Sequence, residues 1–310
     1  MRLSELGEAG LIRRIRDRFR HTPARLGIGD DAAVVDIPPG TSVIYCSDLL
    51  AENVHFIRDL HPPESIGYKS VAVNVSDVGA MGGVPTFFTL SAALPGDLEV
   101  SWIDRFLDGI ARACDELHVN LAGGDSSSAE RIFIDVSMIG WVETGREIRR
   151  SGANPGDSIY VTGCLGASAL GLERLRAGDS KHPAVNAHLY PTPRARIGRS
   201  VISKAHAMMD ISDGLSTDLG HILEESQVSA TIYRKQIPAA PGTDDKHVLH
   251  GGEDYELIIV APELPSEVDG VPVTRIGEII PAGTAPHIVL VDGSSETLLS
   301  PRGYEHFTQG

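Results

Sequence analysis

The sequence of residues 65–83 is SIGYKSVAVNVSDVGAMGG, which predicts a buried helix. An apolar stripe recurs at i, i+4 and i+7, the period of an α-helix, and consists of Val71, Val75 and Val78. A polar stripe with the same spacing lies one residue behind it and consists of Ser70, Asn74 and Asp77. Nearly all the other residues are small and apolar, so we expect both stripes to be buried. A Gly-Gly pair and Pro85 end the helix.

The carboxylate of Asp77 has two interpretations. A buried charge is costly unless it is paired or holds a metal. Asp77 could accept a hydrogen bond from a backbone amide near the helix end, or it could bind a cation. Asn74, one turn earlier, would either orient Asp77 or bond only to nearby backbone. Residues 65–83 alone do not choose between these readings.

Composition limits the possible functions. The 310 residues suggest about two domains, and 42% hydrophobic with 22% charged residues is typical of a globular protein. The net charge of −15 and the pI near 5.2 argue against nucleic-acid or membrane-surface partners. The sequence has no signal-like or membrane-spanning apolar run, and its number of cysteines is odd. We therefore expect a cytoplasmic protein with reduced thiols at Cys46, Cys114 and Cys164.

Hydrophobic periodicity predicts an α/β (α+β) protein in two domains, residues 1–145 and 146–310, with the boundary in the polar, turn-rich segment 144–154. Helices are expected at 3–20, 65–83, 99–117, 167–177, 194–204 and 215–225. Cys114 lies on the apolar face of the third of these helices, and Thr192 with Pro193 would begin the helix at 194. Strands are expected directly after a glycine turn at 27–29 and at 43–46, 87–94, 119–122, 132–142, 158–162, 207–211, 229–233 and 256–261, followed by a β-rich tail.

Acidic residues recur where these strands end. Each stands beside Gly or Ser, and they are Asp48, Asp125, Asp210 and Asp213, with Asp30 and Asp31 on the glycine turn ahead of a strand. One such Asp is an ordinary turn residue. Several of them, with Asp77, favour a hard cation such as Mg²⁺, which takes oxygen ligands and completes its shell with water and phosphate oxygens. Phosphoryl transfer is the chemistry that such a site supports.

Two further features fit phosphate binding. Gly123 and Gly124 would let backbone amides approach a phosphate, and the Arg150 guanidinium could bind two phosphate oxygens. A solvated hinge arginine is the alternative for Arg150. The P-loop, dinucleotide-binding, nucleophile-elbow, zincin and protein-kinase motifs are absent, and the pair formed by His247 and His250 is a weak metal signal.

Seven segments, in order along almost the whole chain, resemble the thiamine-monophosphate kinase family of the aminoimidazole ribonucleotide synthetase-like superfamily. They are GDDAA at 29–33, Ser47-Asp48 with His55-Phe56, the NVSDVGAMG run at 74–82, GGD at 123–125, RSGA at 150–153, DISDG at 210–214 and GGEDYEL at 251–257. Ser47 stands where the family often has Thr, and Tyr304 where some members have Trp.

The resemblance implies a two-domain fold whose N-terminal sheet pairs with its twin in a homodimer, with ATP and Mg²⁺ bound mainly by the N-terminal domain and a C-terminal α/β domain completing the site. It implies transfer of a phosphoryl group from ATP to thiamine monophosphate, directly and in line, with no covalent intermediate and no protein nucleophile. The implied Mg²⁺ ligands are Asp30, Ser47, Asp48, Asp77, Asp125, Asp210 and Asp213; nucleotide contacts are Gly124, Asp125, Arg150 and Ser212; substrate contacts are His55, Glu253 and Tyr304.

Two other functions are weighed against this one. Sister activities of the superfamily, selenophosphate synthesis and carboxamide dehydration, would need a reactive cysteine in an N-terminal glycine-rich segment or at the C-terminus, and neither is present. A non-catalytic nucleotide- or Ca²⁺-binding protein would share the acidic pattern but would form no ADP.

Overall fold

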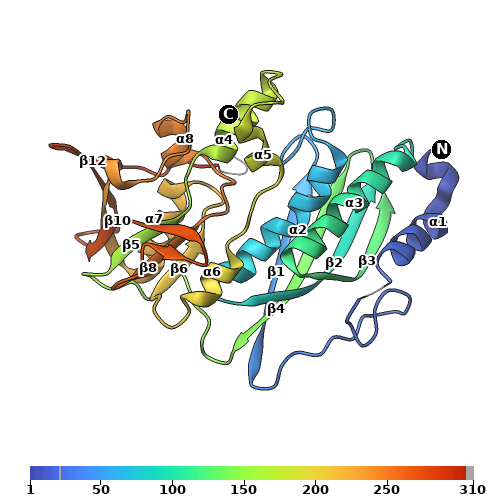
Figure 1. The fold of residues 1–310 in the computed structure, drawn as a ribbon, viewed down its shortest axis with the longest axis horizontal. Coiled ribbons are helices and arrows are strands. Elements are labelled where there is room, and N and C mark those ends of the chain that lie inside the picture. The colour runs from blue at the N-terminus through green and yellow to red at the C-terminus, as the bar shows by residue number, and fades with distance from the viewer. Residues whose placement is uncertain (21, 305–310) are drawn as a thin grey trace. The chain divides into compact units, whose positions relative to one another are not determined.

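The computed structural model describes residues 1–20 and 22–304, which fold as two compact units (Figure 1). The first consists of Met1–Val78 and Val84–Thr144, and the second of Gly79–Gly83 and Gly145–Gly310. Each unit is built on one sheet. No helix in the described part of the chain has the length and apolar character needed to cross a membrane.

The first unit is a four-stranded sheet with helices on one face (Figure 1). The strand order is β1 (Thr41–Ala51), β4 (Phe133–Glu143), β2 (Val84–Leu94) and β3 (Asn120–Ser128). The first three are antiparallel neighbours and β3 is parallel to β2. Its helices are α1 (Leu3–Arg18), α2 (Pro63–Ala80) and α3 (Val100–Leu117).

The predicted burial of α2 is confirmed for the apolar stripe and for two residues of the polar stripe. Val71, Val75 and Val78 are at most 2% exposed, and Ser70 and Asn74 are fully buried. The two helices α2 and α3 approach closely because each places a glycine against the other's backbone. A Cβ on Gly67 would lie 2.1 Å from the carbonyl oxygen of Phe106, and one on Gly109 would lie 1.9 Å from that of Glu64.

The other face of this sheet carries exposed apolar side chains. Strand residues alternate between the two faces, and β4 alternates strictly between buried and less buried positions. The helix-facing residues of β4 are buried, whereas large apolar side chains on the opposite face remain exposed at Val43, Tyr45, Leu49 and Phe133.

The second unit is an eight-stranded mixed sheet. Its strands run β12 (Ser295–Leu299), β11 (Ile288–Asp292), β7 (Val228–Tyr233), β10 (Val271–Pro281), β5 (Ser158–Thr162), β8 (Leu257–Ala261) and β6 (Ala207–Asp210), with β9 (Glu267–Val268) paired to β10. The helices are α4 (Ala167–Arg176), α5 (Pro183–Leu189), α6 (Ala195–Ser200), α7 (Leu215–Ser226), the 3₁₀ turn η1 (Arg234–Gln236) and α8 (Asp245–His250).

Two apolar clusters form the core of this unit. The larger packs the apolar face of α7 (Leu215, Leu219, Ile222 and Leu223) against β-strand residues such as Ile159 and Ile258. The second packs Ile197 and Val201 of the α6 region against residues such as Tyr160 and Ile259. Neighbouring residues of β5 and β8 thus enter different clusters, which is why both strands read as continuous apolar runs.

Several sequence predictions are wrong in detail. β1 does not end at Ser47, because β1 and β4 stay in register from Thr41 opposite Glu143 to Ala51 opposite Phe133. β3 likewise continues through Gly123–Gly124–Asp125, held by its parallel pairing with β2. The expected strand after the glycine turn forms only isolated bridges, between Leu26 and Val34 and between Ile28 and Asp30. Helix α5 falls in a segment predicted as loop, and α6 begins after Arg194 rather than after Thr192.

Candidate functional site

A polar group lies on the exposed face of the first unit's sheet. Ser47 donates a hydrogen bond of 2.8 Å from its Oγ to Oδ1 of Asp135. The Ser137 hydroxyl lies 3.1 Å from the Ser47 hydroxyl and 3.2 Å from Asp135 Oδ2. Ser47 pairs directly with Ser137 across β1 and β4, so the three side chains share one face. Asp135 carries no local sequence signal, because it lies mid-strand without a neighbouring glycine.

Asp125 lies in the same row of the sheet. It pairs with Ser91 of β2, and Ser91 pairs with Asp135 of β4. Gly124, its neighbour, has a packing role that the sequence did not indicate. A Cβ at Gly124 would lie 1.9 Å from the carbonyl oxygen of Leu90, whereas one at Gly123 would meet nothing closer than 3.9 Å. The β2–β3 ladder therefore requires glycine at 124 and tolerates a side chain at 123.

Asp48 lies on the helix-facing side of β1, and Asp77 lies in α2, the helix that contacts this side of the strand through Asn74. Cys46, two residues before Asp48 on the same strand face, places its thiol 3.6 Å from both the side-chain and backbone carbonyl oxygens of Asn74. Asp77 follows Asn74 by one turn of α2 and is half-buried rather than fully buried as predicted. The Asn74 side-chain amide donates to the carbonyl oxygen of Ser70 at 3.1 Å, which is a local backbone bond of the kind expected for the second reading of Asn74.

Asp30 and His55 lie in loops of the first unit. Oδ1 of Asp30 accepts a 2.9 Å hydrogen bond from the amide of Asp31, an arrangement typical of a turn. The imidazole Nδ1 of His55 accepts a 3.0 Å hydrogen bond from the amide of Ala51, which fixes the ring in the loop after β1. Oxygen ligands are thus available at Asp30, and the ring orientation of His55 is set by backbone.

In the second unit, two predicted segments lie side by side. The amide of Glu253 donates to the carbonyl of Ser212 at 2.8 Å, and the amide of Tyr255 donates to that of Ile211 at 2.9 Å. The contact is tight, since a Cβ at Gly252 would lie 2.4 Å from the Ser212 carbonyl oxygen. The amide of Tyr304 reaches the Asp213 carbonyl at 3.3 Å. The structure therefore brings together Asp210, Ser212, Asp213, Glu253 and Tyr304.

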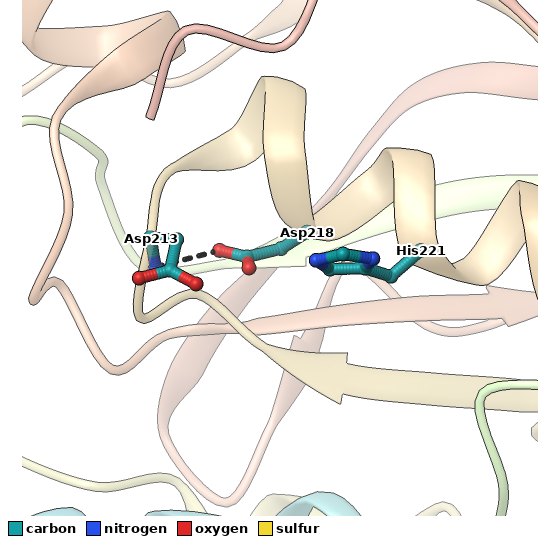
Figure 2. A group of neighbouring side chains, drawn as sticks. All are labelled: Asp213, Asp218 and His221. Carbon is teal, nitrogen blue, oxygen red and sulfur yellow. Dashed lines mark hydrogen bonds between the residues drawn. The ribbon is translucent and has the colours of Figure 1, made fainter. Parts of the chain in front are cut away.

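An acidic cluster forms where β6 leads into α7. Asp210 ends β6 and is buried, and Asp213 lies in the turn before the helix. Asp218, in the first turns of α7, is fully buried, and its Oδ2 accepts hydrogen bonds from the amides of Asp213 at 3.0 Å and Gly214 at 2.9 Å (Figure 2). Burial, together with the nearby charges of Asp213 and Asp210, raises the pKa of Asp218 to about 8, against the lowering effect of the two amides.

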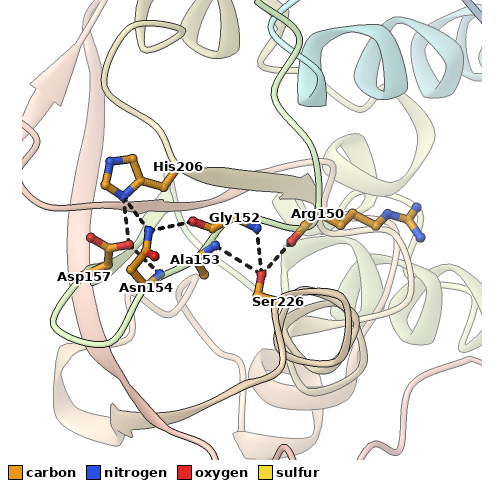
Figure 3. Close-up of polar contacts among 7 residues, drawn as sticks. All are labelled: Arg150, Gly152, Ala153, Asn154, Asp157, His206 and Ser226. Atoms are coloured by element: carbon orange, nitrogen blue, oxygen red, sulfur yellow. Dashed lines mark hydrogen bonds and ion pairs between the residues drawn. The ribbon is translucent and has the colours of Figure 1, made fainter.

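Arg150 lies at the other end of α7. Ser226, the last residue of that helix, accepts hydrogen bonds from the amides of Gly152 at 3.1 Å and Ala153 at 3.2 Å, and its hydroxyl lies 3.2 Å from the Arg150 carbonyl (Figure 3). The Arg150 side chain points away from this network and is exposed. The loop is therefore fixed by its backbone, while the guanidinium is left accessible.

Glu253 is held by His188, a buried histidine that no local sequence pattern marks. Nδ1 of His188, in α5, lies 3.3 Å from Glu253 Oε2 and 3.1 Å from the Ser168 hydroxyl. The neighbouring Asp254 accepts hydrogen bonds from the amides of Gly166 at 2.6 Å and Ser168 at 3.2 Å, which cap α4. Burial raises the pKa of Asp254 to about 7 despite these two bonds. The segment 251–257 thus combines an anchored carboxylate with a capping one.

The donors of both units fit Mg²⁺. Apart from the imidazoles, they are carboxylate and hydroxyl oxygens, the ligands that Mg²⁺ prefers. The negative field that Asp210 and Asp213 impose on Asp218 is the field that a bound cation would relieve.

The fold and these two groups of residues define an AIR synthase-related protein. The chain matches the model of "AIR synthase related protein, N-terminal domain" over residues 29–142 and that of the C-terminal domain over residues 154–287. It is 37% identical to thiamine-monophosphate kinase of Aquifex aeolicus over 99% of this chain and 100% of the relative. It is also 37% identical to the Escherichia coli K12 enzyme of that name over 97% and 98%.

A solved structure, AaThiL complexed with AMPPCP and TMP, superposes with a TM-score of 0.78 at 36% identity, covering 99% of both chains. The chain belongs to the thiamine-monophosphate kinase family, whose members are phosphotransferases.

Proposed function

We propose that this protein transfers the γ-phosphoryl group of ATP to thiamine monophosphate, giving thiamine diphosphate and ADP, the last step in making that cofactor. The observation that carries the proposal is the full-length similarity to AaThiL, which was solved with an ATP analogue and TMP. The transfer is direct and in line, without a covalent enzyme intermediate, so the protein contributes positioning and charge neutralisation.

Mg²⁺ would be held by oxygen donors on both units. The proposed ligands are Asp30, Ser47, Asp48, Asp77, Asp125, Asp210 and Asp213. Their role is electrostatic, because two phosphate-bearing molecules must approach a strongly acidic protein, and bound Mg²⁺ neutralises both sides when present. The hydrogen bond from Ser47 holds Asp135 beside this group, which adds one more carboxylate to the exposed face of the sheet.

Nucleotide contacts are proposed for Gly124, Asp125, Arg150 and Ser212, and substrate contacts for His55, Glu253 and Tyr304. A guanidinium binds phosphate oxygens in pairs, and the fixed backbone with an accessible side chain at Arg150 supports that role. Glu253 would face the cationic thiazolium, and its contact with His188 limits its movement. In this scheme residues 1–145 hold most of the ATP and Mg²⁺ contacts, and residues 146–310 complete the site.

A homodimer formed through the first unit's sheet is part of the proposal. Val43, Tyr45 and Leu49 are 53%, 66% and 51% exposed on one face of β1. Ser47 lies between Tyr45 and Leu49 on this face, so these exposed apolar side chains border the polar group described above, and such a face is a candidate for an interface. A second copy would cover it, and Tyr45→Glu would give monomers in sedimentation velocity, whereas Leu298→Glu, at an exposed apolar site of the second unit, would not.

The reduced thiols are consistent with the cytoplasm.

The test is product formation from ATP and Mg²⁺ with either thiamine monophosphate or thiamine, measured by chromatography of the thiamine species and of ADP. We expect thiamine diphosphate and equimolar ADP from the monophosphate, and no product from thiamine. Nucleotide binding without ADP formation would refute the kinase and leave a binding protein. Asp77→Ala and Asp125→Ala should lose turnover far more than they lose thermal stability.

A further inference from the structure

One carboxylate oxygen in the second unit is buried without a partner. Asp218 is fully buried, and its Oδ2 accepts the two amide hydrogen bonds described above. Its Oδ1 has no hydrogen-bond partner among the described residues. An unsatisfied buried carboxylate oxygen is costly, and a bound cation is one of the few groups that remove the cost.

Two other groups that could bind a metal lie beside this carboxylate. Asp218 and His221 are three residues apart in α7 and therefore share a helix face. Figure 2 shows the Asp218 carboxylate lying between the Asp213 carboxylate and the His221 imidazole. Ligand atoms of Asp213, Asp218 and His221 all lie within 4.8 Å of one another, and this is the one group of its kind among residues 1–20 and 22–304.

Asp213 is also among the proposed Mg²⁺ ligands, but its combination with Asp218 and His221 favours a different ion. Mg²⁺ is bound almost entirely by oxygen and keeps several waters, whereas an imidazole with carboxylates suits divalent transition metals. We propose that Asp213, Asp218 and His221 form a binding site for one divalent transition-metal ion, for which Mn²⁺ is the probe. The site would hold the 211–214 turn to α7, and it does not rest on the phosphoryl-transfer reaction.

The test uses Mn²⁺ with the full-length protein in the absence of nucleotide. Because the proposed Mg²⁺ ligands are all oxygens, nitrogen coupling in the pulsed electron paramagnetic resonance spectrum isolates the imidazole-bound ion. We expect ¹⁴N modulation from one Mn²⁺ per chain, replaced by the ¹⁵N pattern after ¹⁵N-histidine labelling. His221→Gln should remove the modulation, and Asp218→Asn should weaken Mn²⁺ binding by more than about 10-fold. His287→Gln, at a histidine bonded to Ser229 in the same unit, is the matched control.

Three results would overturn the site. One is wild-type protein that binds Mn²⁺ without nitrogen modulation, which needs no variant to fold. Another is modulation that persists in His221→Gln. A protonated Asp218, seen as a carboxylic-acid infrared band that remains with saturating Mn²⁺, would show that a proton rather than a metal satisfies Oδ1.

Discussion

Gly124→Ala gives a direct test of why glycine occupies the GGD segment. A Cβ at this position would stand 1.9 Å from the carbonyl oxygen of Leu90 and 2.8 Å from its carbonyl carbon. Both atoms are backbone of the neighbouring strand, so relief requires β3 to move away from β2. Overpacking of this kind costs about 1–3 kcal/mol, and the gain from replacing a strand glycine returns about 0.5–1 kcal/mol. We expect a net destabilisation of about 1–2 kcal/mol.

Gly123→Ala is the matched control, because the nearest atom to its Cβ would be the Thr89 methyl at 3.9 Å. It should leave stability unchanged or raise it by up to about 1 kcal/mol. Urea unfolding followed by tryptophan fluorescence reports on this unit, since the protein has two tryptophans, Trp102 in α3 and Trp141 in β4. Equal midpoints for the two variants would refute the packing explanation. Equal loss of ATP binding in both, with unchanged midpoints, would assign the glycines to phosphate contact instead.

Three further predictions concern packing, thiol chemistry and the Arg150 loop. Gly109→Ala should lower the midpoint of the same fluorescence transition by an amount equivalent to about 1–2 kcal/mol, because its Cβ would meet the Glu64 backbone at 1.9 Å. Gly220→Ala in α7, whose Cβ would meet nothing nearer than 3.9 Å, should stabilise the second unit by up to about 1 kcal/mol, measured by circular dichroism. Burial raises the pKa of Cys114 from 9.0 to about 12, so its thiol should resist a thiol-reactive reagent at pH 8 until the protein unfolds. The free energy of unfolding should fall as the pH rises above 9, because the thiol loses its proton first in the unfolded chain. Rapid labelling of Cys114 in the folded protein would contradict this. Ser226→Ala should raise the KM for ATP several-fold with a smaller change in kcat, because it removes the hydrogen bonds that hold the backbone of residues 150–153 and does not touch substrate. An unchanged KM in steady-state kinetics would show that the loop keeps its shape without Ser226.

The sequence was informative where burial is one-sided and periodic. The Val71, Val75 and Val78 stripe located α2, and the run from Ser158 to Thr162 was predicted to the residue because all of β5 is buried. It failed where distant pairing decides. Ser47 and Asp48 look like a strand end, yet β1 continues because β4 pairs with every residue to Ala51. Helix α5 was missed because its proline-rich surroundings suggest a loop, although Pro183 occupies the first turn, where no amide is needed.

The site shows the same division. Acidic residues beside glycine or serine were found from local chemistry, and the structure joins Asp210, Ser212, Asp213 and Glu253 in one place. Asp218 was overlooked because a carboxylate three residues into a helix usually faces solvent, and no local pattern reveals that it is fully buried. Its spacing from His221 was the available signal. Asp135 bonds to Ser47 and His188 contacts Glu253, partners that are far away in the sequence. A single sequence does not show such long-range contacts.

Helix α7 ties down a loop at each end by the same device. Asp218 near its start accepts two consecutive backbone amides, 213 and 214, and Ser226 at its end accepts two more, 152 and 153. Its 12 residues span about 18 Å. The length of the helix therefore fixes the distance between the acidic turn at 213–214 and the loop that carries Arg150. A one-residue insertion within it would turn Ser226 by about 100° relative to Asp218 and so detach one loop without replacing any residue.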